Sequence, residues 1–385
     1  MLKEGLANTA SRKKRFVLLF DDLQSVHLFK DVGQVPFQMY KHYGYDAEIV
    51  CRRGREDFLY IDDVLNGLKI TVIDESPYRY LARQARDIDV LMLMHISTRS
   101  ACRGILYKFL NPAGCLYIKA DLTGSQVDFG QWVDQDVFTH VKRVVLRKKL
   151  LRSVDVVSLE TQAAFSGADV IPADKRLLLP NGFDPDFIDL YGVHRRGFAE
   201  KENLILLVAR HGDDVKNTEL MLDALEIMGD IAEWQVWFVG PMTPEFEQRK
   251  DRFLQNNPRL AGKVVFSGQM DDKRELFELY SRAKILCLTS RRESWGMVCV
   301  EALCFGAALV MTNVDSSSDL TGDGQAGIVI PQGDCAVCAE TLLQLMGNQE
   351  LLETYHDAAR RHFDEHFIWK DILKPLAGRI AEKTI

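Results

Sequence analysis

The sequence has no apolar run long enough to cross a membrane and no excess of positive charge. A transmembrane helix needs about 20 consecutive apolar residues, and no apolar stretch here approaches that length. The basic stretch before "RFVLLF" precedes too short an apolar segment for a signal peptide. Lys and Arg number 48 against 55 Asp and Glu, which gives a net charge of −7 and argues against a general nucleic-acid-binding protein. We expect a cytoplasmic protein that does not bind nucleic acid.

Paired metal-binding cysteines and a dinucleotide-binding motif are missing as well. Cys335 and Cys338 form one C-x-x-C, but no second pair lies at the spacing of a zinc site. Most of the eight cysteines lie in apolar runs such as "ILCLTS", which is typical of buried free thiols in a reducing compartment. No G-x-G-x-x-G follows the first predicted strand, which argues against an NAD enzyme.

Short β-rich runs alternate with longer helical patterns along the 385 residues. Several runs are continuously apolar, as parallel strands covered on both faces are. A first series of strands is predicted at 15–20, 46–50, 69–74, 88–94, 114–120, 154–159 and 176–180, and a second at 203–210, 234–240, 263–268, 283–290, 307–312 and 327–330. The polar, turn-rich segment 181–203 reads as a linker. The pattern therefore predicts two doubly wound α/β domains with a cleft between them.

Two cations follow the predicted strand 203–210, at the edge where an open parallel sheet binds ligands. Arg210 and Lys216 lie near the start of a helix expected from about Thr218. Two cations beside the free N–H groups of a helix N-terminus make an anion site that suits a diphosphate. The alternative is that both are surface cations paired with Asp213 or Asp214.

Two acids lie in "RRESWGMVCVEALCFG", which follows the predicted strand 283–290. We expect a loop from Ser290 to Gly296 and a helix over 297–305, with Gly296 allowing a ligand close to the backbone. Glu293 and Glu301 could each accept a pair of hydrogen bonds from the vicinal hydroxyls of a sugar or ribose. The alternative is a solvated loop acid and a helix acid paired with a neighbouring cation.

These motifs resemble a known enzyme family. "ESWGMVCVE" is similar to the E-x7-E pattern of retaining GT-B glycosyltransferases, especially glycosyltransferase family 4, also called glycosyl transferases group 1. "NGFDPDF", "LVARHGDDVKN" and "AGIVIPQGD" resemble further segments in the family's order, so the resemblance covers roughly residues 154–334. It implies an α/β GT-B fold of two Rossmann-like doubly wound parallel-sheet domains with an interdomain cleft.

The resemblance also implies domain roles. Residues 1–185 would form the N-terminal acceptor domain, and residues 186–365 the C-terminal nucleotide-sugar donor domain. The final segment, 366–385, has a helix pattern interrupted by Pro375, and the family's last helix packs back on the first domain.

In activity, the resemblance implies a retaining hexosyltransferase with a UDP- or GDP-sugar donor and a glycan, lipid-linked or small-molecule acceptor. Polysaccharide biosynthesis is the expected setting, and no metal ion or other cofactor is expected. Arg210 and Lys216 would bind the diphosphate and stabilise the charge of the leaving group. Glu301 would hold the ribose and Glu293 the transferred sugar. Further donor contacts would come from the backbone of the surrounding loops, at Ser294, Trp295, Gly296, Met297 and Gly268.

The first domain resembles the family less closely. Gly33 is the glycine that follows the first strand, where the family often has a Gly-Gly loop. His95 stands one residue later than a histidine found near the reacting centre in some members, and a core or helix-capping role is its alternative. Lys119 and Asp121 end "YIKADL", and Asp121 could bind the acceptor or assist proton transfer. All four are candidate acceptor-binding residues, and His95 and Asp121 are also candidate catalytic residues.

Residues 141–152, "VKRVVLRKKLLR", are basic and amphipathic. Such a helix can bind anionic lipid at a membrane surface, and a solvated helix face is the alternative. Two other functions stay open: another GT-B sugar-nucleotide enzyme, such as an epimerase or hydrolase, or a non-catalytic nucleotide-sugar-binding partner subunit. The intact set of Arg210, Lys216, Glu293 and Glu301 argues against the partner subunit.

Overall fold

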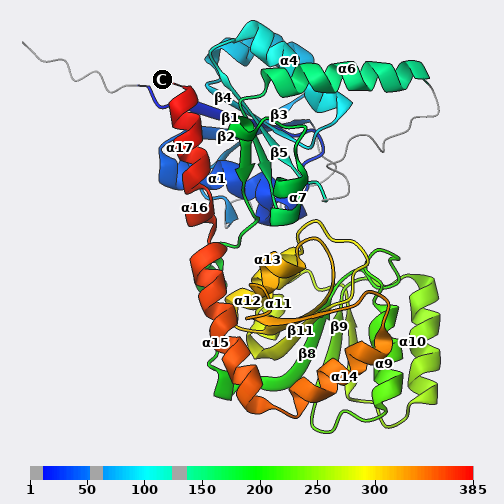
Figure 1. Ribbon diagram of the computed structural model, residues 1–385. Helices are drawn as coiled ribbons and strands as arrows, with labels where there is room; N and C mark the ends of the chain where they lie inside the picture. The colour runs from blue at the N-terminus through cyan, green and yellow to red at the C-terminus, as the bar shows by residue number, and fades with distance from the viewer. Residues whose placement is uncertain (1–11, 53–63, 124–136, 385) are drawn as a thin grey trace, which may run out of the picture. The chain divides into compact units, whose positions relative to one another are not determined.

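The computed structural model describes residues 12–52, 64–123 and 137–384, which contain two parallel β-sheets. The first sheet has seven strands in the order β3-β2-β1-β4-β5-β6-β7, and the second has six in the order β10-β9-β8-β11-β12-β13 (Figure 1). The strands are β1 (Arg15–Leu19), β2 (Asp46–Arg52), β3 (Lys69–Ile73), β4 (Val90–Met94), β5 (Cys115–Ala120), β6 (Val156–Leu159), β7 (Arg176–Leu178), β8 (Glu202–Val208), β9 (Gln235–Val239), β10 (Val264–Gly268), β11 (Ala283–Leu288), β12 (Ala308–Thr312) and β13 (Gly327–Ile330). Each lies where the sequence predicts a strand, so the doubly wound α/β class is confirmed.

Helices connect most of the strands. In chain order they are α1 (Asp31–Tyr43), α3 (Pro77–Gln84), α4 (Thr98–Leu110), α6 (Val137–Ser153), α7 (Gln162–Gly167), α8 (Asp186–Leu190), α9 (Glu219–Met228), α10 (Pro244–Asn256), α11 (Lys273–Arg282), α12 (Met297–Cys304), α13 (Ser317–Thr321), α14 (Cys335–Met346), α15 (Gln349–His366), α16 (Trp369–Ile372) and α17 (Lys374–Lys383). Several begin after a side chain that accepts a bond from a free N–H of the first turn, for example Ser97 before α4 and Asp334 before α14. In the described ranges no helix has both the length and the apolar character that crossing a bilayer requires.

The described residues pack into two compact units. Of the described residues, the first unit contains those within 12–120, 137–157 and 373–384, and the second contains 121–123 and 158–372. Helix α17 belongs to the first unit, where the Lys14 ammonium donates to the carbonyl of Thr384 at 2.9 Å. Pro375 lies in the first turn of α17, where the missing N–H has no helical acceptor, so it starts a helix and does not interrupt one. The domain boundaries predicted at 185/186 and 365/366, and the cleft, stay predictions.

The segment 181–203, expected as a linker, is folded into the second unit. It contains α8, and Phe183 and Phe187 are buried. The ring of Phe183 lies edge-on to that of Phe277, with 5.4 Å between the centroids. The segment packs through buried aromatic side chains, and its otherwise polar, turn-rich composition gives no sign that these side chains are buried.

Each sheet contains one pair of neighbouring strands after which the chain continues toward opposite edges of the sheet, β1 with β4 in the first sheet and β8 with β11 in the second. The chain passes from β1 to β2 and β3 on one side, and from β4 to β5 on the other. In the second sheet, β8 leads to β9 and β10, and β11 leads to β12 and β13. The carboxyl ends of such a strand pair form a topological switch point, which is where open α/β sheets bind ligands.

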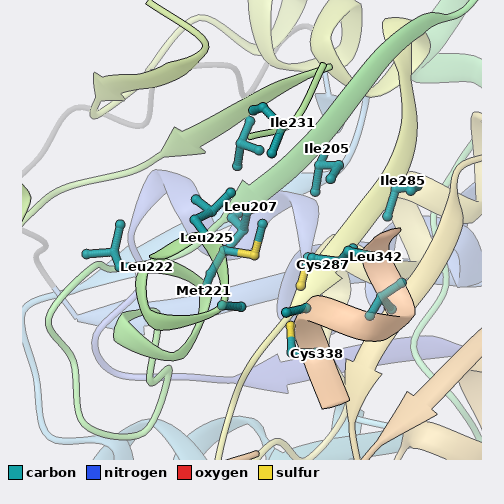
Figure 2. Close-up of a cluster of buried hydrophobic side chains, with 14 of the residues drawn as sticks. Ile205, Leu207, Met221, Leu222, Leu225, Ile231, Ile285, Cys287, Cys338 and Leu342 are labelled. Carbon is teal, nitrogen blue, oxygen red and sulfur yellow. The ribbon is translucent and has the colours of Figure 1, made fainter. Parts of the chain in front are cut away.

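Apolar side chains from both strands and helices form the core of the second unit (Figure 2). Leu207 of β8 and Cys287 of β11 meet Met221 of α9 and Cys338 of α14 in this cluster. A hydrogen bond to Cys338, together with burial, holds the pKa of the Cys287 thiol well above its usual range. The C-x-x-C cysteine Cys338 is fully buried in this apolar cluster and is therefore a packing residue.

A buried imidazole lies directly after β8. The ring of His211 is fully buried and stacks on Phe246 with a centroid separation of 5.3 Å, while Phe238 meets it edge-on. Burial lowers the pKa of His211 to about 4. The folded unit therefore keeps this ring neutral at pH values where the unfolded chain protonates it.

Replacing His211 with Phe should change how stability depends on pH. Because the pKa of His211 in the folded unit lies below its ordinary 6.5, its contribution is present above pH 6.5 and is lost as the pH falls toward 4. The loss amounts to about 3 kcal/mol at most. Urea unfolding at pH 7.5, 5.5 and 4.5 should show wild type losing stability relative to His211→Phe as the pH falls. The control is His194→Phe, at an exposed position. Parallel pH profiles for wild type and His211→Phe would contradict this assignment.

Candidate functional site

Two loops meet at the switch point of the second sheet. One follows β8 and runs to the start of α9, and the other follows β11 and runs to the start of α12. Both loops lie at the carboxyl ends of adjacent parallel strands, since β8 pairs with β11 in parallel register. The predicted loop over Ser290–Gly296 and the helices predicted from about Thr218 and from Met297 are confirmed.

An ion pair joins the two loops. The ammonium of Lys216 lies 2.5 Å from Oε2 of Glu293, and the hydroxyl of Ser290 donates to the same oxygen at 3.3 Å. The side chains of Lys216 and Glu293 are only 22 % and 14 % exposed. Two charges withdrawn this far from water cost free energy unless they are paired, so the pair fixes the two loops at one position. A cation and a carboxylate, both still reachable from solvent, thus stand side by side at the switch point.

Hydrogen bonds to the main chain hold the two loops in register. The amide N–H of Arg291 donates to the carbonyl of Val215 at 2.8 Å. The hydroxyl of Thr289 donates to the carbonyl of Lys216 at 3.1 Å, and the side-chain amide of Asn217 donates to the carbonyl of Thr289 at 3.4 Å. These bonds fix the backbone on both sides of the ion pair, so its side chains need little reordering to bind a ligand.

A second layer of polar side chains supports the loop after β11. The hydroxyl of Thr312 donates to the carbonyl of Ser290 at 2.5 Å. The amide of Gln332 donates to the carbonyls of Arg291 and Asn313 at 2.9 and 2.7 Å. Sequence analysis missed these residues, and only their places, Thr312 at the end of β12 and Gln332 two residues after β13, could have indicated them.

Arg210 is placed differently from Lys216. Its side chain is 67 % exposed, and its guanidinium pairs with Asp213 at 2.6 Å. Its hydrogen bonds hold the pKa of the Asp213 carboxyl below its usual range. In this structure Arg210 is therefore a surface cation paired with Asp213, which is one of the two alternatives that the sequence left open. Lys216 instead pairs with Glu293. The donor role of Arg210 stays a prediction.

Gly296 shapes the start of α12. Its φ is 90°, which favours glycine, and a Cβ there would lie 3.4 Å from Cγ of Glu293. Met297 opens the helix and Ser294 precedes it in the loop, both half-buried. Glu301 lies in the second turn of α12 and is half-buried. The pKa of Tyr280 is raised well above its usual value, mainly by burial and next by the negative charge of Glu301. The loop carboxylate of Glu293, the start of α12 and the helix carboxylate of Glu301 thus follow one another along the chain.

The side chain of Trp295 anchors the loop. It is 2 % exposed, and its indole N–H donates to the carbonyl of Asn181 at 2.8 Å. Phe367 meets the indole edge-on at 5.7 Å. The predicted ligand contact at Trp295 concerned its main-chain amide, and the side chain has this separate anchoring role. Gly268 ends β10 with a φ of 72° and is half-buried. Its contact with the donor stays a prediction.

In the first unit, a cavity of about 690 Å³ lies at the carboxyl ends of β1 and β4. His95 lines it, is exposed, has a φ of 59° and donates its backbone N–H to the carbonyl of Lys119 at 2.8 Å. Asp21 also lines the cavity and pairs with Arg103 and Arg99 at 2.6 and 3.2 Å. The structure thus places His95 at the switch point of the first sheet, next to a cavity with charged walls.

The other three acceptor-side candidates do not line this cavity. Lys119 is fully buried, with its ammonium 3.9 Å from Asp31. Gly33 is buried within α1, where a Cβ would lie 2.4 Å from the carbonyl oxygen of Leu28, so close packing explains this glycine. Asp121 is exposed. The acceptor-binding roles of Gly33, Lys119 and Asp121 stay predictions. Among the described side chains, no group of three His, Cys, Asp or Glu is placed to hold a metal ion.

Two parallel-sheet α/β units with polar loops at their switch points define a protein with the GT-B fold, and solved structures agree. The Anabaena protein Alr3699/HepE, crystallised in complex with UDP, matches with a TM-score of 0.71 at 14 % identity, over 96 % of this chain and 100 % of that one. A glycosyltransferase from Rickettsia africae matches with a TM-score of 0.71 at 14 % identity, over 97 % and 99 %.

Sequence comparison supports the same family. Residues 194–362 match the family described as "Glycosyl transferases group 1", so the resemblance is confirmed over this part of the chain. Phosphatidyl-myo-inositol mannosyltransferase of Mycobacterium leprae is 27 % identical over 51 % of this chain and 52 % of its own length. N-acetyl-alpha-D-glucosaminyl L-malate synthase of Bacillus anthracis is 28 % identical over 44 % and 43 %. The chain spans about half the length of the curated relatives it matches.

Replacing Trp295 with Phe tests whether the indole anchors the loop. The change keeps an aromatic ring but leaves the buried carbonyl of Asn181 without its donor. The free energy of unfolding of the second unit should fall by about 1–2 kcal/mol, measured by urea unfolding. The matched control is Trp237→Phe, because the indole of Trp237 donates to Gln235 at 3.0 Å on the exposed surface; it should change stability by less than about 0.5 kcal/mol. An equal loss in the free energy of unfolding for the two variants would show that the hydrogen bond to Asn181 does not stabilise the loop.

Proposed function

We propose that this protein is a retaining glycosyltransferase that moves a hexose from a nucleotide-diphosphate sugar to an acceptor hydroxyl, without a metal ion. The observation that carries the proposal is the pair of Lys216 and Glu293 at the switch point of the second sheet. A diphosphate needs a cation, and a sugar needs a carboxylate that accepts hydroxyl hydrogen bonds. Both groups are present, held by main-chain bonds and next to the start of α12.

In the proposed reaction the bond between the anomeric carbon and the diphosphate oxygen breaks. Its electron pair goes to the diphosphate, and the negative charge that develops there is stabilised by the ammonium of Lys216 and the N–H groups at the start of α12. The acceptor oxygen forms the new bond to the anomeric carbon and loses its proton. These fixed groups supply positive charge at the leaving group, which is the role that Mg²⁺ has in other transferases.

The carboxylates orient the donor. Glu293 can accept bonds from sugar hydroxyls through the oxygen that does not bind Lys216, so one side chain would position both the cation and the sugar. Glu301, one turn into α12, is proposed to hold the ribose. Arg210, which is exposed and forms an ion pair with Asp213, is proposed to turn toward the diphosphate when the donor binds.

The cavity in the first unit is proposed to take the acceptor. His95 lines it and could accept the proton that the acceptor hydroxyl loses. The compared proteins support a nucleotide-sugar donor, because Alr3699/HepE was crystallised with UDP and with UDP-glucose. They leave the acceptor class open, since the names of two relatives include a lipid, phosphatidyl-myo-inositol, and a small acid, L-malate.

Removing either partner of the ion pair should abolish most of the transfer activity. Lys216→Ala and Glu293→Ala should each lower kcat by about 10²–10³-fold, because each loses charge stabilisation at the reacting centre. Release of UDP or GDP from UDP-glucose or GDP-mannose, with a panel of glycan, lipid-linked and small hydroxyl acceptors, provides the measurement. Lys263→Ala is the matched control, since Lys263 also forms an ion pair, with Asp230 at 2.8 Å on the exposed surface, and it should retain wild-type kcat.

Three results would contradict the proposed function or identify another enzyme. Wild-type turnover in both variants would refute the site assignment, and strict dependence on Mg²⁺ or Mn²⁺ would refute the metal-free mechanism. A product that forms equally without acceptor would identify a hydrolase or epimerase. Comparison of the anomeric configuration of donor and product by NMR tests retention.

A further inference from the structure

A second cavity in the first unit, of about 570 Å³, lies between α4 and α6. The α4 side chains that line it are Cys102, Ile105, Leu106, Lys108 and Phe109, and the α6 side chains are Leu146, Lys149 and Ser153. Spacings of three, four and seven residues place each set on one face of its helix. The two helices pack against each other, so these two faces form the walls of a single apolar groove.

Large apolar side chains on these two helices are exposed to water. Phe109, which lines the groove, is 80 % exposed. Val145, one turn before the groove residue Lys149 on the same face of α6, is 58 % exposed. Phe109 is the most exposed large apolar side chain in the described ranges. An apolar groove continuous with an exposed aromatic ring is the kind of patch that soluble proteins keep for a partner.

The charge around the groove is positive, in contrast to the chain's net charge of −7. Neither α4 nor α6 contains an acidic residue. Lys148 and Lys149 are exposed, and neither forms an ion pair in the parts of the chain that the structure describes. The nearby acid, Asp155, is already paired with Lys108 at 3.0 Å. A partner for this face should therefore be apolar and negatively charged.

We propose that the groove and its basic rim, formed by α4 and the described part of α6, dock on an anionic phospholipid surface. Phe109 and Val145 enter the boundary between the headgroups and the acyl chains. Lys148 and Lys149 reach the phosphates, because a lysine can lay its aliphatic stem on apolar surface while its ammonium stays in the headgroup layer. A second copy of this chain fits less well. A twofold contact would bring this basic face against itself, which costs free energy.

The proposal goes beyond the transfer reaction and does not depend on it, because vesicle binding needs neither donor nor acceptor. If both hold, the enzyme works on acceptors presented at a membrane. If transfer fails and vesicle binding is observed, the surface assignment stands alone.

The test is co-sedimentation of the full chain with vesicles of phosphatidylcholine alone or with phosphatidylglycerol at 30 mol % (about one lipid in three, a standard anionic probe). Wild type should bind the anionic vesicles, and raising the salt should weaken binding. Lys148→Glu/Lys149→Glu should bind about 25-fold or more weakly, since each basic residue near the surface contributes about fivefold. Phe109→Glu should weaken binding by about tenfold or more.

Matched controls carry the same changes in the second unit. Arg252→Glu/Arg259→Glu reverses two exposed cations, and Ile227→Glu replaces an apolar side chain that is 55 % exposed; both should bind like wild type. Thermal unfolding of each variant checks that it is folded. The proposal is overturned if wild type does not bind anionic vesicles, if controls and test variants lose binding equally, or if Phe109→Glu abolishes a self-association that is seen without vesicles.

Discussion

The ion pair between Lys216 and Glu293 is the interaction on which the candidate site depends. The two residues lie on loops that follow different strands, and they meet because the sheet order places β8 beside β11. Half-buried charges are stable only when they are paired, so the pair both fixes the loops and keeps two reactive side chains in place. The site is therefore preorganised by the fold before any ligand binds.

The two units present different surfaces. The second unit has a switch point with a cation, a carboxylate and a helix start, which under the proposed function would bind the diphosphate and the sugar of the donor. The first unit has a cavity of about 690 Å³ with charged walls at its own switch point and an apolar groove with basic side chains at its rim. Under these proposals, acceptor binding and membrane contact would be separate from donor binding, and the chain's acidic net charge does not prevent a local basic face.

The strands and the donor-side loops were predictable because their signals are local. Continuous apolar runs identify buried parallel strands, and the residues after each strand mark the ligand-binding edge. The contacts were not predictable: that Lys216 pairs with Glu293 and not with Asp214 depends on how two loops converge. Main-chain bonds from Thr289 and Gln332 leave no pattern in the sequence. The buried phenylalanines of segment 181–203 and the burial of Lys119 likewise follow from packing that composition does not record.

The most direct test of the central claim is a thermal-shift measurement on wild type and Glu301→Ala with UDP, GDP, ADP, CMP and their sugar conjugates. A ligand that binds only the folded state raises Tm. The account predicts that one nucleotide and its sugar conjugate raise the Tm of wild type, and that Glu301→Ala loses most of that rise because the ribose hydroxyls lose their acceptor. No rise with any nucleotide at millimolar concentration, or an equal rise in both proteins, would contradict a donor site at α12.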